Sequence, residues 1–209
     1  MKIYILLLIT VISSLYAASP NPVFGENGMV VSTNVHASEA GVAILKKGGN
    51  AIDAAVAIGF TLAVTCPENG NLGGGGFIIG ATSDGKIFSQ DHREKAPSRS
   101  HRDMFLDNNG SVIPGMSLTS RASSGVPGTV HGLLSAWSDH GSGNIRLQRL
   151  LSSAIRLAEK GFLLSYYQAE LFNSYKDNFA SNKGASIIFI RKDNRPWKQG
   201  DLFVQKDLA

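Results

Sequence analysis

The chain has 209 residues, of which 43% are hydrophobic and 17% are charged. These proportions are typical of a folded globular protein and exclude an intrinsically disordered chain. The formal net charge is +4, but no run of five or more like charges occurs, so we expect no nucleic-acid partner.

The N-terminus has the three-part layout of a secretory signal peptide. Lys2 precedes an apolar stretch over residues 3–12, and small residues follow at 17–19. That stretch is too short to span a bilayer comfortably, although an uncleaved anchor is the alternative. We therefore expect removal of residues 1–18, a folded region at 24–209, no membrane span after cleavage, and a periplasmic or secreted bacterial protein.

The single cysteine, Cys66, excludes an internal disulfide. It stands at the end of an apolar segment, directly before Pro67. A cysteine there is either a nucleophile or a small apolar side chain that fills a gap in the core. The apolar surroundings favour the second interpretation.

The first predicted elements are a strand and two helices. The valine-rich run at 28–34 predicts a buried strand. Ser38 as N-cap and Gly48 as stop delimit the first helix. Residues 51–64 are apolar almost all round and predict a helix buried within the protein, with Asp53 in its first turn, where the helix dipole favours an anion.

Four consecutive glycines, Gly73–Gly76, lead directly into an apolar run. The Asp84–Gly85 pair separates that run from a second one, which predicts a β-hairpin. A flexible linker would be flanked by polar residues, so the glycines favour a close approach between backbone segments. Their spacing fits neither the dinucleotide-binding fingerprint nor the phosphate-binding loop.

The remaining predicted elements are mostly helical, with helix stops at glycines and a helix start at a serine. In chain order they are a helical turn and loop over 100–114, a helix from Pro127 at its first turn to Gly141, a helix over 145–161, a helix starting at Ser165, a short strand and turn over 186–197, and the opening of another helix in 200–209.

No self-contained catalytic constellation is visible in the sequence. Neither a G-x-S-x-G elbow nor an H-E-x-x-H pair occurs, and the five histidines show no metal-ligand spacing. The hydroxyls of Ser38, Ser123 and Ser124 have no evident base beside them in the chain. We therefore expect neither a catalytic residue nor a metal site within these residues.

Arg93 is the best single candidate for contact with a ligand. It follows the second hairpin strand within "DHREKAP", between His92 and Glu94. A guanidinium at a strand end can hold a carboxylate through two parallel hydrogen bonds. The alternative is a surface ion pair between Arg93 and Glu94, which contributes little.

Six segments resemble the γ-glutamyltranspeptidase (glutathione hydrolase) family, bacterial type, in order and with suitable separations, from Gly28 to the last residue. They are "ASEAGVAILKKGGNAIDAAVAIGFTLAV", "GNLGGGGFIIG", "DHREKAP", "RDMFLD", "SGVPGTVHGL" and "GDLFVQKDLA". Two segments depart from the family pattern: "STNVHAS" stands where a His-Pro segment is common, and "DHRE" stands where the family has an aromatic "DFRE".

This resemblance implies an α+β fold, the αββα sandwich of the N-terminal-nucleophile hydrolases, of which the chain would be an N-terminal portion of the large subunit. In that family the precursor cuts itself before a threonine. The threonine becomes the first residue of the small subunit and attacks the γ-glutamyl amide. The resemblance implies that this threonine lies beyond Ala209, and that residues 1–209 alone are inactive.

The resemblance further implies glutathione and other γ-glutamyl compounds as substrates. The glutamyl group would pass to water or to an amino acid or peptide acceptor, without a cofactor. The residue matching Arg93 contributes to the grip on the substrate's α-carboxylate. Two alternatives remain: a related amidase such as a cephalosporin or glutaryl acylase, and a non-enzymatic binding module or inert truncated product.

Overall fold

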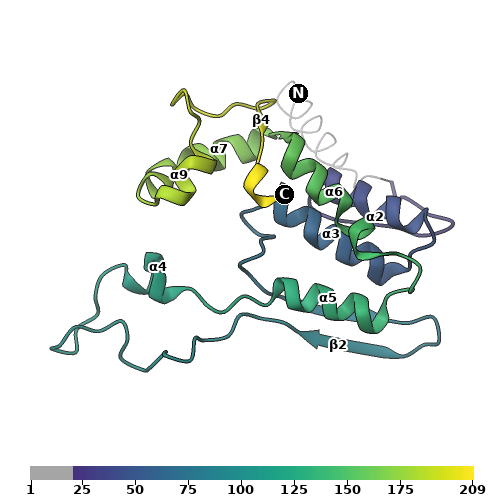
Figure 1. The fold of residues 1–209 in the computed structure, drawn as a ribbon, viewed down its shortest axis with the longest axis horizontal. Helices are drawn as coiled ribbons and strands as arrows, with labels where there is room; N and C mark the ends of the chain where they lie inside the picture. The colour runs from purple at the N-terminus through teal and green to yellow at the C-terminus, as the bar shows by residue number, and fades with distance from the viewer. Residues whose placement is uncertain (1–20) are drawn as a thin grey trace, which may run out of the picture.

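The structure is a computed structural model that describes residues 21–209, so the expected signal peptide at 1–18 lies outside the described residues. Helices predominate, and the strands form two separate two-stranded sheets. Figure 1 shows α2 (Val35–Leu45), α3 (Ala51–Thr65) and α6 (Leu147–Lys160) above, α5 (Thr129–His140) and the first sheet below them, and a long excursion that carries the short helix α4 (Met116–Thr119). The expected mixture of helix and strand is confirmed. Among residues 21–209, no helix combines the length and hydropathy required to cross a bilayer.

The first helix, α2 (Val35–Leu45), begins earlier than Ser38, so the predicted N-cap was wrong. Asn34 has extended backbone angles, and its side-chain oxygen accepts a hydrogen bond from the His36 N–H at 3.0 Å. Asparagine caps a helix at least as well as serine. The Ser38 hydroxyl instead contacts that of Ser32, at 2.7 Å.

The buried strand predicted at 28–34 does not form within the described residues. The segment pairs with no other strand there, and its Val31 side chain is 84% exposed. The valine pattern is suited to an extended chain, but a strand also requires a partner for its backbone N–H and carbonyl groups. Residues 21–209 supply none.

The central helix, α3 (Ala51–Thr65), matches the predicted buried helix almost end to end. Asp53 has a more specific role than the expected helix-dipole interaction, because it forms a capping box with Asn50. Its side chain is fully buried. Oδ2 accepts from the Asn50 N–H at 2.9 Å and from the Ser142 N–H at 3.1 Å. Asp53 thereby fastens the start of α3 to the loop after α5.

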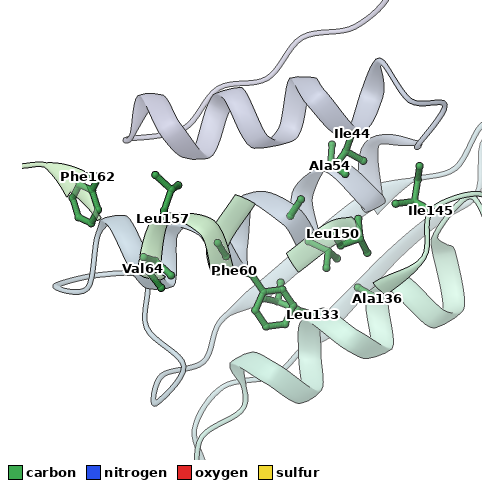
Figure 2. Close-up of a cluster of buried hydrophobic side chains, with 14 of the residues drawn as sticks. Ile44, Ala54, Phe60, Val64, Leu133, Ala136, Ile145, Leu150, Leu157 and Phe162 are labelled. Carbon is green, nitrogen blue, oxygen red and sulfur yellow. The ribbon is translucent and has the colours of Figure 1, made fainter. Parts of the chain in front are cut away.

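The core surrounds α3, which packs against α2, α5 and α6 (Figure 2). Phe60, Leu133 and Leu150 are among its buried side chains. Burial of each such side chain stabilises the fold by about 1.5–3 kcal/mol. Gly41 on α2 faces Ile58, and Gly59 on α3 faces Leu133, where a Cβ would come within 2.7 and 2.9 Å of those side chains. These glycines allow the helices their close approach.

The predicted hairpin is confirmed: β1 (Phe77–Ala81) pairs antiparallel with β2 (Ile87–Asp91). Gly85 in the connecting turn has a φ of +83°, which glycine adopts without strain. The inner face packs on the core through Ile78 and Phe88. The outer face leaves three large apolar side chains more than half exposed: Phe77, Ile79 and Ile87.

Several of the later expectations are confirmed, including the predicted helix stops at Gly141 and Gly161 and the helix start at Ser165. Residues 100–114 form turns and a loop, as expected. The elements between β2 and the C-terminus are α4 (Met116–Thr119), the 3-10 turn η1 (Arg121–Ser123), α5 (Thr129–His140), α6 (Leu147–Lys160), β3 (Phe162–Leu163), α7 (Tyr166–Ser174), α8 (Lys176–Ala180), α9 (Lys183–Phe189), β4 (Leu202–Phe203) and the 3-10 turn η2 (Lys206–Leu208).

Three of the later predictions were wrong. Helix α5 starts after Gly128, so Pro127 precedes the helix instead of forming its first turn. Helix α9 occupies part of the predicted strand at 186–197, because the Asn182 side chain caps it by accepting from two backbone N–H groups. The last residues form β4 and a 3-10 turn in place of a helix, because Phe203 is held in the core, where β4 pairs with β3.

Candidate substrate-binding site

Three backbone segments converge at the end of the first sheet: residues 74–76, 92–95 and 126–129. Gly76 and His92 exchange backbone hydrogen bonds, which extend the hairpin beyond its strands. Lys95 and Val126 form an antiparallel bridge. The Gly74 carbonyl accepts from the N–H groups of Gly128, at 2.8 Å, and Thr129, at 3.0 Å, at the start of α5. The backbone that carries Arg93 is therefore fixed from two sides.

The predicted close approach at the glycine run is confirmed, and Gly75 is the position that requires it. A Cβ at Gly75 would lie 2.5 Å from the His92 carbonyl oxygen and 2.8 Å from the Glu94 nitrogen. These are backbone atoms that cannot move aside. Gly128 meets the same His92 carbonyl, and Gly132 on α5 meets the His92 ring. The segment that begins at His92 is thus enclosed by three glycines.

Sequence reasoning identified the glycine run but did not identify Gly128 and Gly132 as part of the same arrangement. The available signal was the pair of glycines spaced four apart around the start of a helix, in "PGTVHG". Residues at that spacing lie on one face of a helix, and glycine on that face lets another backbone pack closely.

Arg93 extends from this enclosed backbone with its side chain 61% exposed. Its backbone N–H donates to Asp91 Oδ1 at 3.0 Å, and its Nε donates to Glu94 Oε2 at 3.2 Å. The guanidinium carbon lies 5.7 Å from the centre of the Phe77 ring. Within residues 21–209, the two terminal nitrogens of the guanidinium have no hydrogen-bond partner.

The ion pair that sequence reasoning considered as an alternative role for Arg93 is therefore present, but it uses only one edge of the guanidinium. An exposed pair of this kind contributes about 0–1 kcal/mol, so it leaves the arginine able to bind another anion. A planar guanidinium with free N–H groups can donate two parallel hydrogen bonds to one carboxylate. The geometry thus supplies a positioned carboxylate-binding group.

The other candidate residues do not gather around Arg93. Ser38 lies on α2 in contact with Ser32, and the Ser123 hydroxyl donates to the Ser120 carbonyl at 2.6 Å. Ser124 follows the 3-10 turn η1 and has no hydrogen-bonded histidine or carboxylate in the described part of the chain. Nowhere in residues 21–209 do three His, Cys, Asp or Glu side chains form a group that could hold a metal ion.

Cys66 is buried at the end of α3, as its apolar context predicts. Burial raises the pKa of its thiol, and the neighbouring Glu68 carboxylate raises the pKa further. A thiol that holds its proton is a poor nucleophile. The structure thus agrees with the interpretation of Cys66 as a core residue.

Comparison with known proteins assigns this arrangement to a family. Residues 37–209 match the family model of gamma-glutamyltranspeptidase. A glutathione hydrolase proenzyme of Pseudomonas sp. (strain A14) is 46% identical over 197 residues, which are 94% of this chain and 34% of that relative. The crystal structure of Helicobacter pylori γ-glutamyltranspeptidase superposes with a TM-score of 0.86 at 41% identity, over 90% of this chain and 53% of that one. The chain belongs to the γ-glutamyltranspeptidase family.

Two further facts limit how far this assignment reaches. The chain spans about a third of the length of the curated relatives it matches. The cephalosporin acylase of Bacillus halodurans superposes with a TM-score of 0.71 at 22% identity, over 91% of this chain and 36% of that one. At that identity the likeness shows a common fold alone.

Proposed function

We propose that the whole protein to which this chain belongs is a γ-glutamyltransferase and glutathione hydrolase. It cleaves the γ-glutamyl amide of glutathione and related compounds through a γ-glutamyl-enzyme, and passes the glutamyl group to water or to an amino acid or peptide. The family membership and the similarity to glutathione hydrolase proenzymes support this activity. The observation that carries it in the chain itself is the available guanidinium fork of Arg93.

In this proposal Arg93 holds the α-carboxylate of the γ-glutamyl donor. The α-carboxylate is one of the two charged groups, with the α-amino group, that distinguish a γ-glutamyl donor from a simple acyl donor. Enclosure of the neighbouring backbone by Gly75 and Gly128 fixes the point from which the Arg93 side chain extends. A fixed anchor at the α-carbon end presents the γ-amide to the attacking nucleophile in a constant position, which lowers the entropic cost of reaction.

The nucleophile of the proposed reaction is a threonine beyond Ala209, released at the start of a small subunit by self-cleavage of the precursor. Residues 24–209 would then be the N-terminal part of the large subunit in an αββα sandwich. The exposed outer face of the hairpin supports this arrangement, because Phe77, Ile79 and Ile87 form an apolar surface suited to burial beneath a further layer.

The decisive experiment replaces Arg93 by lysine in the full-length, matured protein. Lysine keeps the charge but loses the planar fork. The loss of a charge-assisted hydrogen bond costs about 1.5–3 kcal/mol, so kcat/KM on glutathione should fall roughly tenfold to a hundredfold, mostly through a raised KM. Self-cleavage should persist, since it needs no donor. Steady-state kinetics on glutathione and gel analysis of subunit formation measure both effects.

Two controls make that result specific. Arg102→Lys changes an exposed arginine in the loop after the hairpin and should leave both constants unchanged. A 4-aminobutyryl anilide keeps the amine but lacks the α-carboxylate, so any turnover of it should not respond to Arg93→Lys. Unchanged constants on glutathione in a well-folded, matured Arg93→Lys enzyme would remove Arg93 from the substrate site. A glutaryl anilide lacks only the α-amino group, and its preferential turnover by the wild-type protein would favour the acylase alternative.

We also propose that the protein is exported to the periplasm or secreted, on the basis of Lys2, the apolar residues 3–12 and the small residues 17–19. Mass spectrometry of the exported protein should find an N-terminus after this small-residue region. A Leu7→Arg variant interrupts the apolar stretch and should stay in the cytoplasm. Exported protein that retains Met1 would contradict cleavage.

A further inference from the structure

A groove of about 540 Å³, which Arg93 does not line, lies between the loop after α3 and the helices α7, α8 and α9. This volume is within the range of about 300–1,000 Å³ typical of sites for small molecules. Its lining combines five aromatic rings with one carboxylate: Tyr167, Phe172, Tyr175, Phe179, Phe189 and Glu68.

Glu68 brings a negative charge to this groove without a cation to balance it. Its Oε1 accepts from the Cys66 thiol at 3.2 Å, whereas its Oε2 is buried and has no hydrogen-bond partner in the described part of the chain. No lysine or arginine lines the groove, and no ion pair within residues 21–209 includes Glu68. A carboxylate whose charge no nearby cation balances favours a positively charged ligand in the groove.

The aromatic rings pack against one another and form one side of the groove. Phe179 stacks on Phe189 with ring centres 4.7 Å apart, and both rings pack edge-on against the buried Phe172. Tyr175 lies tilted beside Phe179, with ring centres 6.3 Å apart. Aromatic faces attract cations, and several faces together favour an ammonium whose alkyl groups fill apolar space.

We propose that this groove binds an organic cation with a substituted ammonium group. Glu68 neutralises the charge, and the rings of Tyr167, Tyr175 and Phe179 enclose the alkyl groups, because the faces of Phe189 are covered by Phe179 and Phe203. The Glu68 carboxylate disfavours an anionic ligand, and a neutral ligand would leave its charge unbalanced. A single carboxylate supplies too few ligands for a metal ion. The chemistry of the lining therefore selects an organic ammonium.

The test uses the full-length, matured protein, with choline as the probe and calorimetry as the readout. The matched control ligand is 3,3-dimethylbutan-1-ol, which has the shape of choline without its charge. Choline should bind, and the alcohol should bind at least tenfold more weakly. Glu68→Gln keeps an acceptor for the Cys66 thiol but removes the charge, and should weaken choline binding about tenfold or more.

Glu170→Gln is the control substitution, because it removes an exposed carboxylate from α7 that does not line the groove. Choline binding should be unchanged in it. If Glu68→Gln misfolds, Tyr175→Ala provides a second test at a half-exposed side chain and should also weaken binding. The proposal is overturned if the wild-type protein does not bind choline, as when another part of the protein fills the groove. Equal binding of the neutral alcohol, or normal choline binding by a well-folded Glu68→Gln protein, would also overturn it.

Discussion

At the scale of single residues, one backbone contact determines where Arg93 stands. Gly75 has no side chain because the backbone of His92 and Glu94 occupies the space a Cβ would need. The constraint is steric alone, since Gly75 does not have a left-handed φ. Alanine could adopt its backbone conformation but could not fit beside its neighbours.

Replacement of Gly75 by alanine should therefore push the backbone of residues 92–94, which follows the second hairpin strand, away from the glycine run Gly73–Gly76. Overpacking of this kind typically costs about 1–3 kcal/mol of stability. The displacement of Arg93 should also raise KM for glutathione in the full-length enzyme. Thermal unfolding and steady-state kinetics measure the two effects.

Gly73→Ala is the matched control from the same run. A Cβ there meets only the side-chain oxygen of Asn71, at 3.3 Å, which can give way. The melting temperature of Gly73→Ala should stay close to that of the wild-type protein. Equal melting temperatures for Gly75→Ala and Gly73→Ala would show that the contact with His92 and Glu94 does not constrain the fold.

At the scale of elements, those with local signals were predicted well. The turn at Asp84–Gly85 and the helix α3 each depend on a short stretch of neighbouring residues, and both were found at the expected positions. The position of Arg93 directly after the second hairpin strand followed from the same local reasoning. The enclosure by Gly128 and Gly132 did not, because those residues meet His92 only through the packing of α5.

The elements that were predicted wrongly depend on residues far away in the chain. The run at 28–34 has strand character but no partner in residues 21–209. Strand β4 forms because Phe203 reaches a cluster with Phe162 and Phe172, far away in the chain. A local pattern predicts conformational preference, but it does not predict which distant side chain completes the core.

Ion pairs that the sequence analysis did not identify hold the loop between α9 and β4. Arg191 donates to both oxygens of Asp193, at 3.0 Å each, and to Asp201 at 2.6 Å, and it lies over the Trp197 ring. Arg191 and Arg195 hold the pKa of the Asp193 carboxyl well below its usual range. The Asp193 carboxylate therefore stays charged and paired with both arginines further into the acid range than an ordinary aspartate.

At the scale of the whole molecule, the outer face of the hairpin is an apolar surface that nothing covers within the described residues. Phe77, Ile79 and Ile87 lie side by side on it, and neither outer edge of the two-stranded sheet is paired within the described residues. Apolar sheet faces and open edges favour association with other chains.

Expression of residues 21–209 alone should accordingly give an aggregating product without a sharp cooperative melt. Ile79→Lys should make this product more soluble, because it places a charge in the middle of the apolar face. The same substitution in the full-length protein should lower the melting temperature or the yield of matured enzyme. Light scattering of the short chain and thermal unfolding of the long one measure these opposite effects.

Val112→Lys is the matched control, since Val112 is also an exposed apolar side chain but lies in the loop after the hairpin. It should change neither measurement as much as Ile79→Lys does. A monomeric, cooperatively melting chain of residues 21–209, or a full-length Ile79→Lys protein with unchanged stability and yield, would show that this face needs no cover.

The enclosure of His92 also has a consequence for how this region can change in length. Side chains alternate between the two faces of an extended backbone, so a shift by one residue reverses the side on which each one emerges. Loss or gain of a single residue within Gly73–Gly76 would move a different residue against the His92 carbonyl and change the register in which Arg93 leaves the sheet. The glycine run thus acts as a spacer of fixed length. Single-residue insertions and deletions there should be tolerated less well than substitutions at Gly73, even though the run looks from its composition like the most pliable part of the chain.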